Sequence, residues 1–283
     1  MSFLPDRDIP DLSGKFILVT SGNSGLGKES ILQFAKHTPR QIFMGARSRS
    51  KAEEAIREIQ NAVPKANITF VEIDLSSFAS VKNVADSLLQ QCDRLDILLN
   101  NAGLMGVAPG LTKDGYEMQF GSNHMGPALL TKLLMPLLDK TSSLPGSDVR
   151  IVQVSSDAYQ FAPKEGILFS QLKTPLADIG GRARYGQSKL ANLYFIKSLA
   201  KRYPNYAYVS WIINIAKKLF FVDVQTGALG QLWASTGSSN EVKSGAYYIP
   251  LKKEVKGTKV VDNIEMADKL WNWTEKEFVK NGM

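Results

Sequence analysis

Between residues 16 and 210, short apolar segments alternate with longer segments of helical periodicity. This alternation is typical of repeated β-strand–α-helix units, whose strands pair in parallel within one sheet. The strands are apolar nearly throughout, which indicates that helices cover both faces of the sheet. Six strands are predicted, at Phe16–Thr20, Gln41–Met44, Ile68–Ile73, Leu95–Leu99, Val149–Val154 and Tyr206–Ser210.

Helices are predicted between these strands and after them. The predicted helices include Lys28–Lys36, Ser50–Ala62, Phe78–Gln91, Leu129–Leu138 and a terminal amphipathic segment, Asn263–Val279. The 283 residues contain no internal repeat and no long linker, so one α/β domain over residues 1–283 is expected.

The composition is that of an ordinary soluble globular protein, with 44% hydrophobic and 22% charged residues. A single cysteine, Cys92, excludes an intramolecular disulfide framework and suits a reducing compartment. Together with His37 and His124 it cannot supply a structural zinc site at the usual spacings. No metal site is therefore expected.

The N-terminal residues are polar and contain two prolines, so no secretory signal is predicted. No apolar run reaches bilayer length, because the longest candidate, Tyr208–Val222, contains Lys217 and Lys218. A cytoplasmic protein without a transmembrane segment is expected, with peripheral membrane contact left open. The net charge is +7, but no aromatic–basic groove motif accompanies it, so nucleic-acid binding is not predicted. An anionic small ligand explains the basic cluster Arg47–Lys51 more simply.

The first predicted strand runs directly into a glycine-rich turn, Thr20–Gly27. Strand, glycine-rich turn and helix together present backbone N–H groups and a positive helix end to a pyrophosphate. Gly25 and Gly27 are expected to let the ligand approach closely, where a Cβ atom would intrude. The alternative is that the turn merely connects two elements. The predicted cofactor-binding residues here are Ser21, Gly22, Ser24, Gly25, Leu26, Gly27 and Lys28.

The second strand ends in Phe43–Arg47 and has no carboxylate at its end. Folds that prefer NAD usually place an acidic residue there to bind the ribose hydroxyls. Arg47 can instead pair with a 2′-phosphate, and Lys28 can add a second positive charge. NADP(H) is therefore favoured over NAD(H), against the alternative that both side chains are solvated surface charges.

Tyr185 and Lys189 stand four positions apart in the stretch ARYGQSKLAN, which places both side chains on one face of a helix. The same spacing occurs at Tyr248 and Lys252, where the internal Pro250 argues against a helix. The first pair is the candidate for chemistry.

These motifs together resemble the short-chain dehydrogenase/reductase family, and more narrowly its retinol-dehydrogenase-like branch, which includes fungal reductases of secondary metabolism. The resemblance covers nearly everything from residue 11 to about residue 210. It implies a Rossmann-type doubly wound parallel sheet of about seven strands, with helices on both faces. The ordered motifs are Thr20–Gly27, Asp74-Leu75, Asn100–Gly103, Asn123–Gly126, Val154–Ser156 and Tyr185–Lys189.

The resemblance also implies a role for each matching residue. Asp74 would accept from the adenine amino group, and Asn101, Ala102 and Gly103 would shape the floor of the cofactor site. Asn123 would hold a water that links Lys189 to solvent. The structural alternatives are that Asp74 caps a turn and that Asn123 bonds backbone. A homodimer through the helices flanking the active site is common in the family.

The chemistry implied is carbonyl reduction or alcohol oxidation on a lipophilic small molecule. Tyr185 would exchange a proton with the substrate oxygen, and Ser156 would steady that oxygen by hydrogen bonding. The Lys189 ammonium is expected to lower the pKa of Tyr185 and to hold the nicotinamide ribose. An extended-family epimerase or dehydratase is disfavoured by the glycine spacing and the length.

Two departures from the family pattern bear on activity. Ser21 stands where the family has glycine, and a positive φ there would cost on the order of 1 kcal/mol. After the sixth strand the family's Pro-Gly turn and threonine are missing. By comparison with the family, roughly two dozen residues are absent, which indicates an internal deletion after about residue 210. The remainder, Phe220–Leu229 and Gly245–Pro250, resembles the closing helix and last strand. A rival hypothesis is an NADP(H)-binding protein with little or no turnover.

Overall fold

The computed structural model of the chain describes residues 3–204, 207–213, 223–249, 253–254 and 259–283. Their strands form one sheet in the order β3-β2-β1-β4-β5-β6-β7-β8, parallel except for the last pair. The strands are β1 (Phe16–Thr20), β2 (Gln41–Ala46), β3 (Ile68–Glu72), β4 (Ile97–Asn100), β5 (Arg150–Ser156), β6 (Ala207–Ile213), β7 (Tyr247–Ile249) and β8 (Lys253–Glu254).

The α/β class and the doubly wound parallel sheet are confirmed. All six predicted strands are present, the first with the predicted bounds and the other five with shifted ends. Eight strands are described instead of about seven, because β8 adds a two-residue antiparallel edge. The predicted start of the sixth strand, Tyr206, lies outside the described residues. So does 214–222, where the sequence predicts the junction of the deleted segment.

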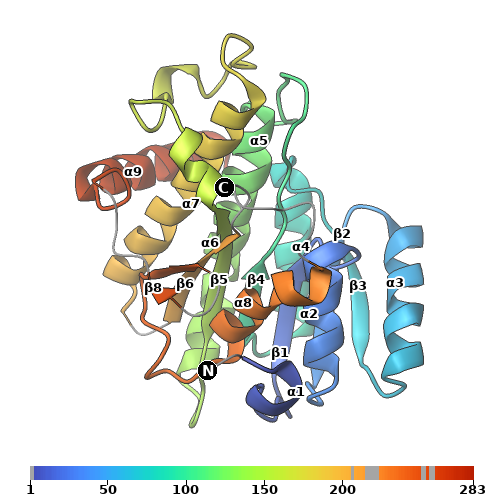
Figure 1. Cartoon of the computed structure of the whole chain (residues 1–283). Coiled ribbons are helices and arrows are strands. Elements are labelled where there is room, and N and C mark those ends of the chain that lie inside the picture. Colours follow the sequence, from blue (N-terminus) through green and yellow to red (C-terminus); the bar gives the residue numbers. More distant parts are fainter. Residues whose placement is uncertain (1–2, 205–206, 214–222, 250–252, 255–258) are drawn as a thin grey trace.

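Helices cover both faces of the sheet (Figure 1). Against one face lie α2 (Gly25–Ala35), α3 (Arg49–Ala62) and α8 (Val224–Thr236), and against the other lie α4 (Phe78–Gln91), α6 (Gly126–Ser142) and α7 (Gly181–Arg202). The remaining helices are α1 (Pro5–Asp8), α5 (Met118–Phe120) and α9 (Ile264–Lys280), with a π-helical turn at Gly121–Met125 and 3-10 turns at Asp157–Phe161 and Phe169–Gln171.

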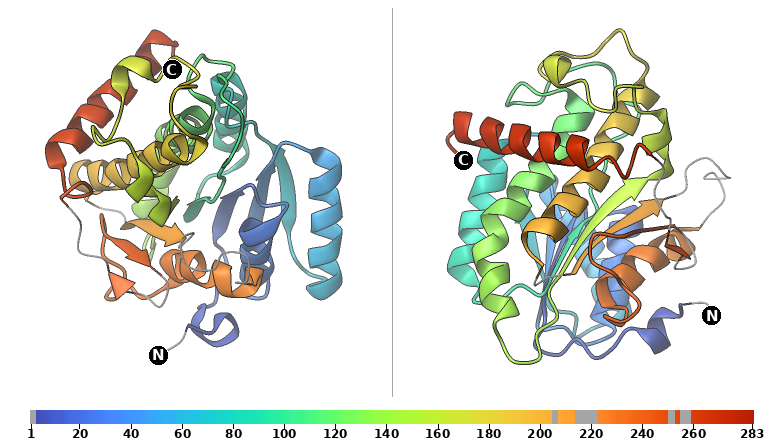
Figure 2. Two further views of the ribbon diagram at one scale, coloured as in Figure 1. Left: turned by 45° about the horizontal axis from the view of Figure 1, so that its top comes forward. Right: turned by 90° about the vertical axis from the view of Figure 1, so that its left-hand side faces the viewer.

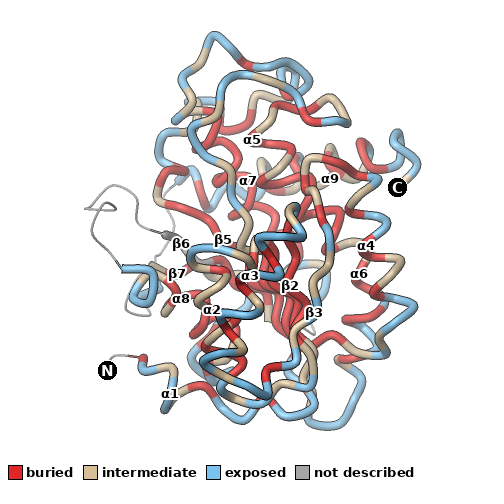
Figure 3. Tube along the Cα trace, turned by 90° about the vertical axis from the view of Figure 1, so that its right-hand side faces the viewer, coloured by how far each residue is buried: buried red, intermediate tan, exposed pale blue. Residues whose placement is uncertain are grey.

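The apolar strands place a hydrophobic cluster on each face of the sheet. In β1, Leu18 packs on the α4–α6–α7 side, while Ile17 and Val19 pack on the α2–α3–α8 side, all fully buried. Each such side chain contributes about 2 kcal/mol by its removal from water. Figure 3 shows the central strands buried and the outer loops exposed. The edge strand β3 departs from the expectation of burial on both faces, because none of its five residues is fully buried.

Helix α9 lies across α6 and α7 (Figure 2, right). Trp271 stacks on Phe195 at 5.9 Å between ring centroids, and Ser198 Oγ donates to the Ala267 carbonyl at 3.2 Å. As a result, α7 is buried at nearly every position from residue 184 to residue 199. A homodimer through the outer face of α7, as the resemblance implies, would require α9 to move away.

The strand order reverses between β1 and β4, because the chain winds outward from β1 through β2 and β3 and then returns. In such sheets the loops after the two diverging strands leave a crevice at the carboxyl edge, where ligands bind. The glycine turn after β1 and the residues after β4 both lie at this edge. Among the described residues no helix is long and apolar enough to cross a membrane.

Candidate active site

The glycine turn between β1 and α2 forms one wall of the crevice. Helix α2 begins at Gly25, three residues earlier than predicted, and its N-cap residue Ser24 makes no side-chain capping bond. The N–H groups of the first helical turn are consequently left for a ligand, and the helix end carries a partial positive charge. Gly25 has φ +51°, and a Cβ built there would meet nothing within 4 Å. The turn therefore fits an anion such as a pyrophosphate.

The reason predicted for Gly27 is wrong. A Cβ on Gly27 would collide with the Ser21 carbonyl oxygen and would lie 2.6 Å from Asn101 Nδ2. Gly22 is similarly confined, since its Cβ would lie 2.6 Å from Ile31 Cδ1. Both glycines therefore allow close packing within the protein, whereas space for a ligand exists at Gly25.

Ser21 adopts the left-handed backbone conformation, with φ +53°. A non-glycine residue in this region is strained by on the order of 1 kcal/mol or more. The positive φ that carries this cost at Ser21 is therefore present. The strain lies in the turn itself, and Ser21 lines the crevice.

A cleft of about 490 Å³ opens beside this turn. It collects residues that follow β1, β2, β3 and β4, together with the π-helical turn before α6. Eight of the predicted site residues line it: Ser21, Ser24, Lys28, Arg47, Asp74, Ala102, Gly103 and Asn123. The other predicted site residues do not line it: Gly22, Gly25, Leu26, Gly27, Asn101, Ser156, Tyr185 and Lys189.

Arg47 and Lys28 differ in their surroundings. Arg47 is exposed at the end of β2 and makes no ion pair within the described part of the chain. Lys28 is paired with Glu58 of α3, so its charge is already compensated. Lys51, one helical turn beyond Arg47, also lines the cleft. Lys51 belongs to the basic cluster Arg47–Lys51, from which the sequence predicts an anionic ligand. Lys51, and not the paired Lys28, is therefore the second cation available to such a ligand.

Asp74 follows β3 at the far side of the cleft. Its Oδ1 accepts from the Ser76 N–H at 3.0 Å and from Ser76 Oγ at 2.7 Å, and its Oδ2 pairs with Lys113 Nζ at 3.0 Å. These contacts outweigh partial burial and lower the pKa of the Asp74 carboxyl. The turn-capping alternative is therefore observed, and the ionised carboxylate still lines the cleft. Sequence reasoning missed Lys113.

The residues after β4 hold the turn and the cleft floor together. Asn101 Nδ2 donates to the Thr20 carbonyl at 2.9 Å, and the Ala102 N–H donates to Thr20 Oγ1 at 3.0 Å. Asn101 therefore braces the glycine turn from behind, while Ala102 and Gly103 form the floor. A Cβ on Gly103 would lie 3.4 Å from Lys189 Nζ, so the floor leads directly to the Tyr185–Lys189 pair.

Asn123 lies in the π-helical turn Gly121–Met125 and is fully buried. Its Oδ1 accepts from the Leu104 N–H at 2.7 Å, and its Nδ2 donates to the Leu104 carbonyl and to Ser188 Oγ, each at 2.9 Å. The Asn123 side chain therefore bonds the backbone of Leu104, as the structural alternative predicts. That Asn123 holds a water linking Lys189 to solvent stays a prediction.

Ser156, Tyr185 and Lys189 meet at the carboxyl end of β5. Tyr185 and Lys189 lie on one face of α7, as predicted, with Lys189 Nζ 5.5 Å from the centroid of the Tyr185 ring. Lys189 Nζ donates to the Val154 carbonyl at 3.0 Å. Ser156 Oγ donates to Asp157 Oδ1 at 3.3 Å and accepts from the Ala158 N–H at 3.1 Å. The competing Tyr248 lies in strand β7 and Lys252 lies outside the described residues.

The expected direction of the Tyr185 pKa is wrong. Burial raises the pKa of Tyr185 to about 12, against a smaller lowering by the neighbouring Ser156 side chain. Burial also lowers the pKa of Lys189 to about 8, because its ammonium is cut off from water. Desolvation acts on both groups against their charged forms and exceeds the attraction between them.

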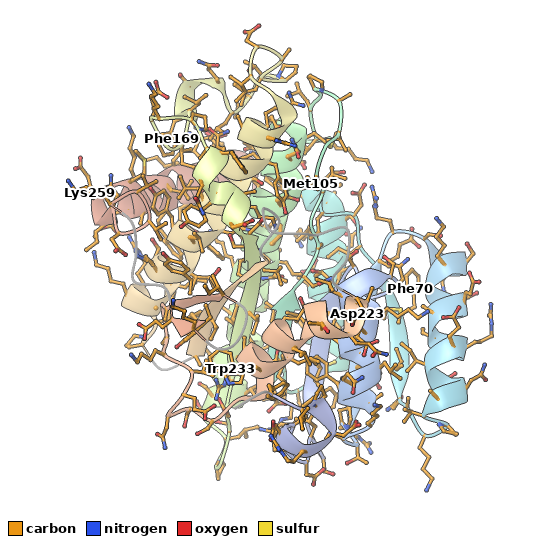
Figure 4. All side chains as sticks on the ribbon, viewed as in Figure 1. Phe70, Met105, Phe169, Asp223, Trp233 and Lys259 are labelled. Atoms are coloured by element: carbon orange, nitrogen blue, oxygen red, sulfur yellow. The ribbon has the colours of Figure 1, made fainter. Side chains whose placement is uncertain are left out.

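Exposed apolar side chains flank this end of the site. Met105, in the loop after β4, is 57% exposed, and Phe161, after β5, is 47% exposed. Both loops lie above the carboxyl edge of the sheet, where Figure 4 labels Met105. The loops after β4 and β5, which form the rims of the mouth of the site, therefore carry exposed apolar side chains. The cleft at the glycine turn is lined by polar residues and by charged residues of both signs.

This fold and this set of motifs have known counterparts. Residues 15–215 match the family described as short chain dehydrogenase. The chain belongs to the short-chain dehydrogenase/reductase family, a family of oxidoreductases.

Relatives lie in the fungal and the retinol-dehydrogenase-like branches. The chain is 35% identical to the short-chain dehydrogenase/reductase drtF of Aspergillus calidoustus, over 96% of each protein. It is 33% identical to human retinol dehydrogenase 14, over 93% of this chain and 86% of the human protein. The narrower resemblance is thereby confirmed.

Two solved structures share the fold. An uncharacterized protein of Mycobacterium paratuberculosis superposes with a TM-score of 0.83 at 26% identity, over 98% of this chain and 97% of the other. The NADPH-bound carbonyl reductase from chicken fatty liver superposes with a TM-score of 0.66 at 22% identity, over 87% and 100%. At 22% identity, the likeness to the carbonyl reductase concerns the fold alone.

Proposed function

We propose that the protein is an NADP(H)-dependent oxidoreductase that interconverts a lipophilic alcohol and its aldehyde or ketone. The observation that carries this proposal is the continuity of two sites at one edge of the sheet. A polar cleft with charged side chains of both signs runs from the glycine turn to Gly103, and Gly103 borders the buried Lys189 beside Tyr185 and Ser156.

The residues suit the proposed cofactor from its adenine to its nicotinamide ribose. Gly25 at the start of α2 suits the pyrophosphate, ionised Asp74 suits the adenine amino group, and Arg47 with Lys51 suits a 2′-phosphate. Gly103 and Lys189 suit the nicotinamide ribose. The bound cofactor supplies or accepts the hydride at the substrate carbon.

The protein's own residues manage the proton on the substrate oxygen. A tyrosine with pKa about 12 is neutral near pH 7, so Tyr185 is ready to donate its proton to the oxygen of a carbonyl group whose carbon accepts the hydride. Ser156 steadies the same oxygen as its charge develops. Lys189, cationic below its pKa of about 8, stabilises the phenolate left on Tyr185.

The proposed substrate is lipophilic because the rims of the mouth carry exposed apolar side chains. Met105 and Phe161 present large exposed side chains there, and exposed apolar surface beside a cleft marks a binding surface.

The test is loss of NADPH absorbance with a panel of long-chain, aromatic and short polar aldehydes and ketones. Turnover of the apolar members, and its loss in Tyr185→Phe, is expected. Turnover that survives Tyr185→Phe within a few-fold would contradict the assignment of the proton donor.

The rival, a cofactor-binding protein with little turnover, draws on a specific observation. The alignment with the Aspergillus relative runs over 304 residues, more than the 283 of this chain, so the relative has residues without a counterpart here. Thermal stabilisation by NADPH with no turnover on any carbonyl would favour the rival. Insertion of a Pro-Gly-x-x-x-Thr segment that recovers turnover would identify what is missing.

A further inference from the structure

Arg184, the residue before Tyr185, is buried at 3% exposure and bonds three separate segments. Its Nη1 donates to the Ile179 carbonyl at 2.9 Å and to the Leu176 carbonyl at 3.3 Å. Its Nη2 donates to the Val107 carbonyl at 2.9 Å. The guanidinium thus joins the loop after β4 and the loop after β5 to the first turn of α7.

The charge of Arg184 is balanced by Glu117, which is fully buried. Arg184 Nε lies 3.2 Å from Glu117 Oε1, and Glu117 Oε2 accepts from the Phe120 N–H at 2.7 Å. Buried ion pairs of this kind give little net stability compared with apolar residues of the same size. Their value lies in fixing one arrangement of the segments they join, which is what these contacts do.

The first turn of α7 is weak without this support. The helix follows Gly180, which provides no side-chain cap, and starts with Gly181, a poor helix former. Tyr185 stands only one turn further along. The side chain that holds this turn in place therefore also sets where the Tyr185 hydroxyl lies.

The loop after β5 carries backbone strain at the point that Arg184 holds. Leu176 has φ +49°, an unfavourable conformation for a bulky residue, and its side chain is buried. Such strain persists only where the surroundings over-determine the conformation, and it is common at functional sites. The Arg184 bond to the Leu176 carbonyl is one of the contacts that keep it.

Gln119 makes a second, parallel connection. Its Oε1 accepts from the Gly106 N–H at 3.2 Å, and its Nε2 donates to the Gly181 carbonyl at 3.1 Å. The two loops carry Met105 and Phe169, which Figure 4 labels above the sheet. Arg184 and Gln119 therefore bind both rims of the mouth to the start of α7.

We propose that Arg184, with Glu117 as its counter-ion, is a positioning residue that holds Tyr185 and both rims of the mouth in register. The inference rests on the proposed function, because it assigns Arg184 to the geometry of that reaction. Its effect is on the rate of the chemical step, since misplacement of a reacting group by about 1 Å costs on the order of a hundredfold.

Arg150 offers a matched control. It is also a buried arginine, pairs with Asp148 and donates to the Gly237 carbonyl at 3.0 Å, but it lies at the opposite end of β5. Arg184→Met and Arg150→Met each remove a guanidinium from a carboxylate and from backbone carbonyls. Both variants are expected to lower Tm.

The experiment measures kcat, the KM for NADPH and amide hydrogen exchange in the four proteins: wild type, Arg184→Met, Arg184→Lys and Arg150→Met. Arg184→Met is expected to lower kcat by about tenfold or more, with the KM for NADPH within about twofold. Arg184→Lys keeps the charge and is expected to recover part of kcat. Arg150→Met is expected to keep kcat within about twofold.

Amide hydrogen exchange tests the positioning role of Arg184 independently of turnover. Faster exchange in residues 176–186 of Arg184→Met, and not of Arg150→Met, supports the positioning role even if the wild type turns over no carbonyl tested. Unchanged exchange there, or an equal loss of kcat in folded Arg150→Met, would overturn it.

Discussion

Lys189 Nζ lies 5.5 Å from the centroid of the Tyr185 ring and donates a 3.0 Å hydrogen bond to the Val154 carbonyl. The ammonium is thus anchored to the end of β5. One helical turn and one strand end fix its distance from the phenol. Burial favours the neutral forms of both groups, so the charge pattern of the site depends on pH.

The buried Lys189 predicts a specific pH dependence of stability. Its folded pKa, about 8, lies below the unfolded value of about 10.4, so the unfolded chain binds more protons between these values and stability rises with pH there. The free energy of unfolding of the wild type should therefore gain on that of Lys189→Met by roughly 1–3 kcal/mol from pH 8 to pH 10. Urea titrations at each pH measure the difference, and a constant difference would contradict the shift.

The strained turn predicts that a glycine at position 21 improves the site. Ser21→Gly relieves a left-handed backbone conformation, and we expect a gain of about 1 kcal/mol in stability and tighter NADPH binding. Ser21→Ala keeps the Cβ and should give neither gain. Thermal unfolding and fluorescence titration with NADPH test both variants, and equal behaviour of the two would contradict the strain.

The basic residues after β2 predict the coenzyme preference. Arg47→Ala should weaken NADPH binding by about tenfold, corresponding to ~1.4 kcal/mol, and leave NADH binding nearly unchanged. Arg49→Ala is the matched control, since Arg49 pairs with Glu53 and lies over the Phe70 ring instead of lining the cleft.

Lys28→Ala should have a smaller effect than Lys51→Ala, because Lys28 is already paired with Glu58. Titrations of each variant with both coenzymes measure these effects. An equal loss of NADPH and NADH affinity in Arg47→Ala would argue against a 2′-phosphate contact.

The cover of α7 by α9 predicts a monomer. Trp271, Asp268 and Ala267 of α9 occupy the outer face of α7, so a second copy finds no exposed face on that helix. Size-exclusion chromatography with light scattering at micromolar concentration should give the mass of one chain, 31.2 kDa. A mass of twice that value would show that another surface, or a displaced α9, forms a dimer.

The sequence by itself determined the sheet, the order of the motifs and the Tyr185–Lys189 pair. These follow from local rules: apolar runs become buried strands, helical spacing places residues on one face, and the carboxyl ends of parallel strands share one edge. The family resemblance rests on the same local signals.

Only the tertiary structure decided what each side chain does there. Lys28 forms an ion pair with Glu58, and Gly27 packs against Ser21. Arg184 pairs with Glu117, a residue distant from it in the sequence. The direction of the Tyr185 pKa was also decided by tertiary structure, because burial and not the neighbouring ammonium dominates it. Desolvation and contacts between distant segments depend on how the whole chain packs, and no local spacing encodes them.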